Sequence, residues 1–186
     1  MKLVQFYQPG QGKRLGVVTR DDVIIDVTSD ESPGVLELLK LSYKEQVSIG
    51  VLLADIQERV SNTASVRFLP PGQADEDKLK LTDLNVPPAA NKPHLLIPIH
   101  PPEVWGCGVT YKRSADMRDE DSQQDIYSRV YNAERPEIFF KATSPRCVGP
   151  YDFIGIRSDS KLTATEPELA YILGANGEIA GYTICN

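Results

Sequence analysis

A proline-rich stretch between residues 61 and 102 divides this chain into two parts with different patterns. Eight of the 14 prolines lie there, seven of them in the runs PPGQADEDK, NVPPAANKP and HPP. Proline lacks a backbone donor and restricts the residue before it, so neither a long helix nor an inner strand can cross the stretch. The sequence predicts a boundary here, with residues 1–100 forming an N-terminal domain and linker and residues 101–186 forming a second domain.

The N-terminal part is typical of short strands followed by helices. KLVQFY, RLGVVT and DVIIDVT predict strands, separated by turns at PGQGK and at residues 20–22. VLELLK predicts a helix, a second helix is expected from about Tyr43 to Val60, and LLIPI is expected to be a short strand. A four-residue spacing predicts one buried face on the second helix, made of Tyr43, Val47, Val51, Leu52, Ile56 and Val60.

The second part is predicted to consist mainly of strands. They are EVWGCGVT, PEIFFKAT, YDFIGIRS, ELAYIL and EIAGYTIC, with a turn at residues 174–177. The polar stretch KRSADMRDEDSQQDIYSRVY predicts a helix or a mobile flap. The fold class is therefore α+β, with a small N-terminal α/β domain before a mainly β domain.

Charge and composition exclude several classes of partner. The net charge of -6 argues against nucleic acid or an anionic membrane as the main partner. No run approaches the roughly 20 apolar residues that cross a bilayer, and MKLVQFYQPG does not resemble a signal peptide. The three cysteines lie far apart without a CxxC motif, so we expect reduced thiols and a cytoplasmic location.

The segment TEPELAYIL carries two glutamates, Glu166 and Glu168, two positions apart. In a strand, residues i and i+2 point to the same face, about 7 Å apart along the chain. Two carboxylates in this arrangement can bind one hard cation, namely Mg²⁺, Mn²⁺ or Ca²⁺. A solvent-facing strand explains the same pair, so the motif alone does not specify a metal site.

Several segments in order resemble the fumarylacetoacetate hydrolase family, and within it the branch of 2-keto-3-deoxy sugar-acid dehydratases. They are EVWGCGVTYKRSAD, AERPEIFFKATSPRCVGP, GIRSDS, EPELAYIL and GEIAGYTICN, which lie within about residues 102 to 186. The resemblance implies a divalent-metal enzyme on a mixed β-sheet roll, usually a homodimer. It places two metal ligands on Glu166 and Glu168. The family's third ligand, an aspartate in a GNDxSxRD segment, would follow Asn186 by one residue, and a site lysine lies further on. We therefore expect an incomplete roll here.

The resemblance also suggests residues for acid–base chemistry. Lys141 matches the lysine of the family's FLKP-type segment, where it can neutralise a substrate carboxylate or an enolate. Glu137 stands where hydrolases of the family tend to have an apolar residue, and it is a candidate general base. A snorkelling lysine and an ordinary edge glutamate explain the same positions.

The remaining candidates are polar residues and aromatic residues around these positions. Ser114 stands where hydrolases often carry a flap histidine in an NYxxHxxE pattern, so the water-activating group of C–C hydrolysis is not visible. His94 and His100 are expected at the surface, and Trp105 and Tyr111 in the core or a pocket wall. Polar residues expected to line the substrate site are Ser114, Arg135, Thr143 and Ser144.

The expected function is the dehydration of a 2-keto-3-deoxy sugar acid by a metal-dependent lyase acting on a small-molecule 2-oxo acid. Glu137, or a residue beyond the end of the sequence, would remove the C3 proton while residues 112–128 close over the site. Two alternatives stay open. One is hydrolysis or isomerisation of an acylpyruvate or diketo acid, and the other is an inactive truncated remnant that lacks the third metal ligand.

Overall fold

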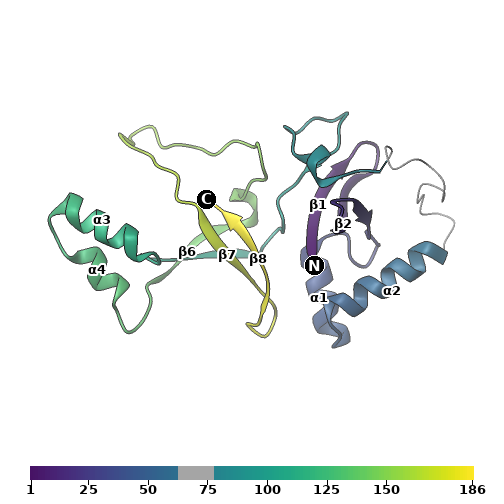
Figure 1. Cartoon of the computed structure of the whole chain (residues 1–186), viewed down its shortest axis with the longest axis horizontal. Helices are drawn as coiled ribbons and strands as arrows, with labels where there is room; N and C mark the ends of the chain where they lie inside the picture. Colours follow the sequence, from purple (N-terminus) through teal and green to yellow (C-terminus); the bar gives the residue numbers. More distant parts are fainter. Residues whose placement is uncertain (63–77) are drawn as a thin grey trace. The chain divides into compact units, whose positions relative to one another are not determined.

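The computed structural model describes residues 1–62 and 78–186 (Figure 1). Contacts group the chain into two compact units, one made of Met1–His100 with Val148–Asn186 and the other of Pro101–Cys147. Much of the predicted connection, including residues 63–65 of NTAS and most of PPGQADEDK, lies outside the described residues. The division into domains at residue 100 stays a prediction.

Four strands form a sheet in the first unit, in the order β3-β2-β1-β4. Their bounds are β1 Lys2–Gln8, β2 Gly12–Val18, β3 Ile24–Asp26 and β4 His94–Leu95. All the pairings are antiparallel. Gly10 and Gly12 have φ angles of 75° and 79°, which glycine tolerates without strain, so the predicted turn at PGQGK is confirmed. The predicted strands KLVQFY, RLGVVT and DVIIDVT are confirmed in their central parts.

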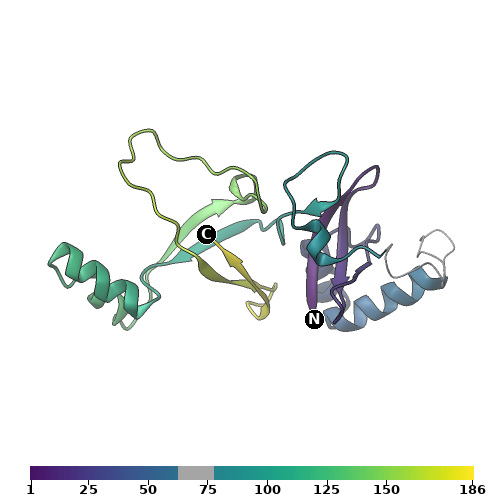
Figure 2. The same cartoon turned by 45° about the horizontal axis from the view of Figure 1, so that its top comes forward.

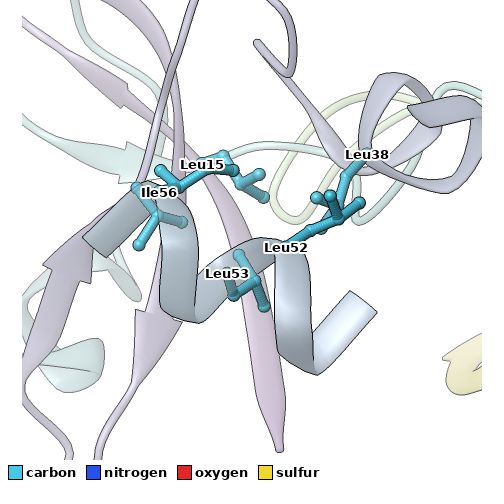
Figure 3. Packing of buried hydrophobic residues seen from close by; sticks show 6 residues of the cluster. Leu15, Leu38, Leu52, Leu53 and Ile56 are labelled. Carbon is cyan, nitrogen blue, oxygen red and sulfur yellow. The ribbon is translucent and has the colours of Figure 1, made fainter. Parts of the chain in front are cut away.

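Two helices cover one face of this sheet (Figures 1 and 2). They are α1, Val35–Glu45, and α2, Ile49–Asn62. Their apolar side chains pack with those of β2 in one cluster (Figure 3), whose buried members are Leu15, Val27, Leu38, Leu52, Leu53 and Ile56. Burial of these side chains, at about 1.5–3 kcal/mol each, fixes the helices on the sheet.

The expected start of the second helix at Tyr43 is wrong. Tyr43 belongs to α1, which ends at Gln46 in a left-handed conformation with φ 55°. The Ser48 hydroxyl then accepts a hydrogen bond from the Val51 N–H, as an N-cap does at the start of α2. This capping sets a new helical phase, so Val51 is 57% exposed and Leu53 takes a core position.

The opposite face of the sheet is covered by the segment that follows the undescribed residues. The short 3₁₀ helix η2, Leu81–Leu84, brings Leu84 against the buried residues Val4, Phe6 and Val18. Partly buried residues around them are Ile24, Leu79, Leu81 and Leu95. The central strand β1 is therefore buried on both faces, which explains why Val4, Gln5 and Phe6 are all inaccessible.

The second unit contains a two-stranded sheet and two helices. Strand β5, Glu103–Cys107, pairs antiparallel with β6, Ile138–Thr143, and a 3₁₀ turn, η3, follows at Ser144–Arg146. Between the strands lie α3, Lys112–Ser122, and α4, Ile126–Tyr131. The helix predicted for the polar stretch is confirmed, although it is interrupted at Gln123, where φ is 55°.

Strands β7, Glu168–Leu173, and β8, Ile179–Cys185, form a hairpin in the first unit. The predicted turn is confirmed, because the Gly177 N–H donates to the Gly174 carbonyl at 3.1 Å. The prediction of a strand at YDFIGIRS is wrong. No strand forms there, and Phe153 is 91% exposed, since no described segment supplies a hydrogen-bonded partner strand. Among the described residues, no helix is long and apolar enough to span a membrane.

The Gln5 side chain joins three parts of the first unit. It is only 1% exposed, and its Oε1 accepts a hydrogen bond of 3.0 Å from the Val35 N–H at the start of α1. Its Nε2 donates to the Ile97 carbonyl at 2.7 Å and lies 3.3 Å from His100 Nδ1. Because Gly34 provides no side-chain cap, this amide from β1 takes over the capping of α1.

We predict that Gln5→Leu lowers the free energy of unfolding by about 2–4 kcal/mol, because the Val35 N–H and the Ile97 carbonyl lose their partner. Urea denaturation followed by circular dichroism measures the change. Gln8→Leu, at the half-exposed end of the same strand, is the control and should change it by less than about 0.5 kcal/mol. Equal stability of the two variants would contradict a capping role for Gln5.

Candidate functional site

The two glutamates of the ExE motif lie where β7 begins. Glu168 is its first residue and pairs with Cys185 of β8, whereas Glu166 lies just before the strand and is exposed. The Glu166 backbone N–H donates to the Asn186 Oδ1 at 2.6 Å, which ties this end of the hairpin together. Exposure alternates along β7: Glu168, Ala170 and Ile172 are half-buried, whereas Leu169, Tyr171 and Leu173 are exposed. The expected alternation of faces is confirmed within the strand.

The donor set at this position suits a magnesium ion. Mg²⁺ usually keeps several water ligands and is bound in proteins through one or two carboxylates together with substrate oxygens. Glu166 and Glu168 supply two carboxylates from positions two residues apart on one chain segment. Within residues 1–62 and 78–186, no three His, Cys, Asp or Glu side chains gather in a way that could hold a metal. The two carboxylates fit a magnesium ion that keeps water ligands.

Glu137 and Lys141 are brought to one face of the β5–β6 pair. The register sets Trp105 opposite Phe140, Gly106 opposite Phe139 and Cys107 opposite Ile138. A hydrogen bond of 2.8 Å from the Gly108 N–H to the Glu137 carbonyl extends the pairing past the end of β6. Because side chains alternate along a strand, Glu137 and Phe139 point to the same side. A register shift between Val104 and Trp105 leaves Lys141 without a partner on β5, and its ammonium reaches the same side by lying 5.7 Å from the centroid of the Phe139 ring.

The other candidate substrate residues also belong to the second unit, but they occupy different elements. Thr143 ends β6 and is exposed, and the half-buried Ser144 begins η3. Arg135 lies exposed in the bend before β6, whereas Ser114 is exposed on α3. The structure thus places Arg135 shortly before β6 and Thr143 at its end. Ser114 lies on α3, earlier in the chain.

Helices α3 and α4 are held together by one carboxylate. Asp119 accepts hydrogen bonds from the backbone N–H groups of Tyr127 and Ser128, each at 2.9 Å. Burial acts to raise the pKa of Asp119, but the hydrogen bonds from Ser128 and Tyr127 outweigh it and the pKa is lowered. On α3 itself, Lys112 Nζ lies 2.8 Å from the Asp116 carboxylate, and this hydrogen bond raises the pKa of Lys112.

Some sequence-based expectations are corrected here. His94 is buried, 7% exposed, with its ring stacked on Tyr7 at 4.9 Å, because β4 inserts it beside β1. His100 is exposed, as predicted. Trp105 is 57% exposed and its ring meets Phe140 edge-on at 5.8 Å, so it is not a core residue within the described chain. Tyr111 is also exposed.

Two glycines that sequence reasoning missed lie opposite the candidate catalytic residues. Gly106 and Gly108 leave the β5 side of this face without side chains, so Phe139 and Glu137 lie across the backbone there. A GxG within the predicted strand EVWGCGVT was the signal that could have indicated this, because glycine in a strand often marks a close approach.

Comparison with known proteins identifies a class of enzyme related to this chain, the dehydratases of 2-keto-3-deoxy sugar acids. The chain is 52% identical over 92 residues to the 2-dehydro-3-deoxy-D-arabinonate dehydratase of Saccharolobus solfataricus. It is 49% identical over 94 residues to a probable 2-keto-3-deoxyxylonate dehydratase of Haloferax volcanii. The matches span 47% and 50% of this chain but only 31% and 32% of those enzymes. No family model matches the chain.

Solved structures of such a dehydratase are similar to this chain over nearly its whole length. The apo form of 2-keto-3-deoxy-D-arabinonate dehydratase matches 99% of this chain with a TM-score of 0.62 and 30% identity. The same enzyme complexed with magnesium and 2,5-dioxopentanoate matches with a TM-score of 0.61. The chain covers 54% of each of those proteins. These likenesses confirm the predicted resemblance: the chain is a relative of the 2-keto-3-deoxy-D-arabinonate dehydratases, and its α+β fold is of their type.

We predict that α4 loses its attachment to α3 at low pH. A carboxyl group with a lowered folded-state pKa stabilises the fold fully above its unfolded pKa of 3.8, and this stability is lost as the pH falls through the lower folded pKa. The Tyr127 and Ser128 amides should therefore be protected from hydrogen exchange at pH 5, relative to an unfolded chain at the same pH, and lose this protection in strong acid.

The variant Asp119→Asn should show reduced protection at every pH, because an amide offers one acceptor oxygen where the carboxylate uses two. Asp121→Asn, exposed on the same helix, is the control and should exchange as the unaltered protein does. Slow exchange at Tyr127 and Ser128 in Asp119→Asn would contradict the assignment.

Proposed function

We propose that the protein acts as a magnesium-dependent dehydratase of a 2-keto-3-deoxy sugar acid. The observation that carries the proposal is the 52% identity over 92 residues to the 2-dehydro-3-deoxy-D-arabinonate dehydratase. The magnesium complex of a structurally similar dehydratase supports the choice of metal. Both curated relatives act, by their names, in dehydration, which favours this reaction over hydrolysis of a diketo acid.

Glu166 and Glu168 are proposed to hold the metal. Magnesium, when bound, supplies a Lewis acid that makes the protons next to a 2-oxo group more acidic. The pairing of β7 with β8 fixes Glu168. The hydrogen bond from the Glu166 N–H to the Asn186 side chain restrains Glu166. The chain therefore presents both carboxylates from an ordered strand end, which reduces the entropy cost of binding a cation.

The chemistry on the substrate is proposed for Glu137 and Lys141. The Glu137 carboxylate would accept the proton from C3 and return it to the C4 hydroxyl as that group leaves as water, which gives the dehydrated keto acid. The Lys141 ammonium would neutralise negative charge on the substrate, either the carboxylate or the enolate oxygen. Arg135, Thr143, Ser144 and Ser114 are proposed as polar groups that orient the substrate, with α3 and α4 excluding water.

The assembly and location of the protein stay predictions. We propose a homodimer, which light scattering on the purified protein tests directly. Its strands expose many apolar side chains, including Tyr171, Tyr182 and Ile184 of the β7–β8 hairpin, and apolar surface of this kind commonly marks an interface. A cytoplasmic location follows only from the sequence.

We predict that Glu168→Gln weakens magnesium binding at least about tenfold, since one of the two anionic ligands is lost and even outer partners of a metal site contribute 10- to 100-fold. Calorimetric titration with Mg²⁺ on the protein as its gene encodes it measures the affinity. Glu58→Gln, exposed on α2, is the control with the same change of charge. Unchanged binding by Glu168→Gln would remove the metal role.

We predict that Glu137→Gln lowers kcat for a five-carbon 2-keto-3-deoxy sugar acid by about 10²-fold or more, because the amide cannot accept the C3 proton. Magnesium affinity should stay unchanged. Proton NMR of the reaction follows loss of substrate, and Glu134→Gln in the preceding bend is the control. Turnover by Glu137→Gln at the unaltered rate would exclude this base, and cleavage of an acylpyruvate in place of dehydration would contradict the proposed function.

A further inference from the structure

On one face of the β5–β6 pair, the β5 side has no side chains at the positions next to Phe139 and Glu137. The residues opposite them are glycines. Gly106 pairs with Phe139 in the register, and the Gly108 N–H donates a hydrogen bond to the Glu137 carbonyl. In the sequence, Phe139 follows the proposed base Glu137 by two residues and precedes Lys141 by two residues. Nothing in the proposed chemistry so far uses this phenylalanine.

The Phe139 ring lies directly on the Gly106 backbone. A Cβ atom added at Gly106 would be 2.5, 2.7 and 3.1 Å from the Cζ, Cε2 and Cε1 atoms of the ring. Carbon atoms in proteins pack at about 3.5–4.0 Å, so even an alanine methyl group would displace the ring. The ring occupies its position only because residue 106 is glycine.

The ring in turn supports the Lys141 side chain. Lys141 Nζ lies 5.7 Å from the centroid of the Phe139 ring, within the range of a cation–π interaction. A lysine ammonium is a compact charge on a long flexible stem, so a free lysine samples many positions. Attraction to the ring quadrupole favours the positions of the exposed Lys141 ammonium above Phe139 by about 0.5–1 kcal/mol.

We propose that Phe139 is a positioning residue, whose ring, seated on Gly106, holds the Lys141 ammonium ready for the negative charge of the substrate. The inference rests on the proposed function, which assigns Lys141 to that charge. It adds two determinants of substrate binding, Phe139 and Gly106, that act through the lysine and make no chemical contribution of their own.

Three variants separate the aromatic face from simple bulk. Phe139→Leu keeps an apolar side chain but removes the ring, Phe139→Tyr keeps the ring, and Gly106→Ala keeps Phe139 but displaces it. Gly181→Ala is the matched control, because Gly181 is also a strand glycine, in β8, and a Cβ there meets nothing within 4 Å. Circular dichroism checks that each variant is folded.

The first measurement is the steady-state kinetics of the protein as its gene encodes it, with a 2-keto-3-deoxy sugar acid and Mg²⁺. Phe139→Leu and Gly106→Ala should raise KM about two- to fivefold, the value of an exposed cation–π contact, with kcat nearly unchanged. Phe139→Tyr and Gly181→Ala should retain the unaltered KM. An equal rise of KM in Phe139→Leu and Phe139→Tyr would overturn the proposal, because the ring would not be the cause.

The second measurement does not depend on turnover. Protons of the Lys141 ε-methylene group lie near the ring face and should be shifted upfield in the NMR spectrum by its ring current. The shift should vanish in Phe139→Leu and Gly106→Ala and persist in Phe139→Tyr. If the unaltered protein turns over no 2-keto-3-deoxy acid, the proposed function is refuted. Loss of the methylene shift in Phe139→Leu and Gly106→Ala would still support the contact between Lys141 and the ring. A methylene signal that is the same in Phe139→Leu overturns the inference in either case.

Discussion

The backbone hydrogen bonds between β5 and β6 hold the part of the chain on which the proposed chemistry depends. They fix a register in which Gly106 faces Phe139, and the bond from Gly108 continues that register to Glu137. A shift of one residue would turn Glu137 and Phe139 to the opposite face. The small side-chain volume of the two glycines then decides how the β6 side chains lie. A single pairing therefore controls the orientation of a carboxylate, an aromatic ring and an ammonium group.

The sheets of this protein differ in how they are covered. The β3-β2-β1-β4 sheet has helices on one face and η2 with its neighbours on the other, so even the polar Gln5 is buried and fully hydrogen-bonded. The β7–β8 hairpin instead exposes a row of apolar side chains, with Tyr171 and Tyr182 meeting edge-on at 5.3 Å. Nothing among the described residues covers that row. The end of the hairpin where Glu166 and Glu168 lie is ordered by pairing and by Asn186, without burial in a core.

The accuracy of the sequence predictions follows the range of the interactions that decide each feature. Alternating apolar residues and turn glycines located the main strands, because those signals act within a few residues. The helix boundary near Tyr43 was wrong since the left-handed Gln46 and the Ser48 cap reset the helical phase. YDFIGIRS has the composition of a strand but no paired neighbour in the described chain. His94 was expected at the surface, yet pairing of β4 with β1 buries it against Tyr7.

The amino-acid sequence by itself determined the chemical groups available and their order: two glutamates at one strand end, a glutamate and a lysine four positions apart, and glycines in the strand before them. The resemblance carried by these segments is confirmed by the relatives of the chain. Only the tertiary structure decided that Gly106 lies under Phe139, that Lys141 extends over its ring, and that Gln5 caps a helix thirty residues away. The contacts of Gly106 and of Gln5 join residues distant in sequence, and no local pattern encodes them because strand pairing and core packing select which distant residues meet.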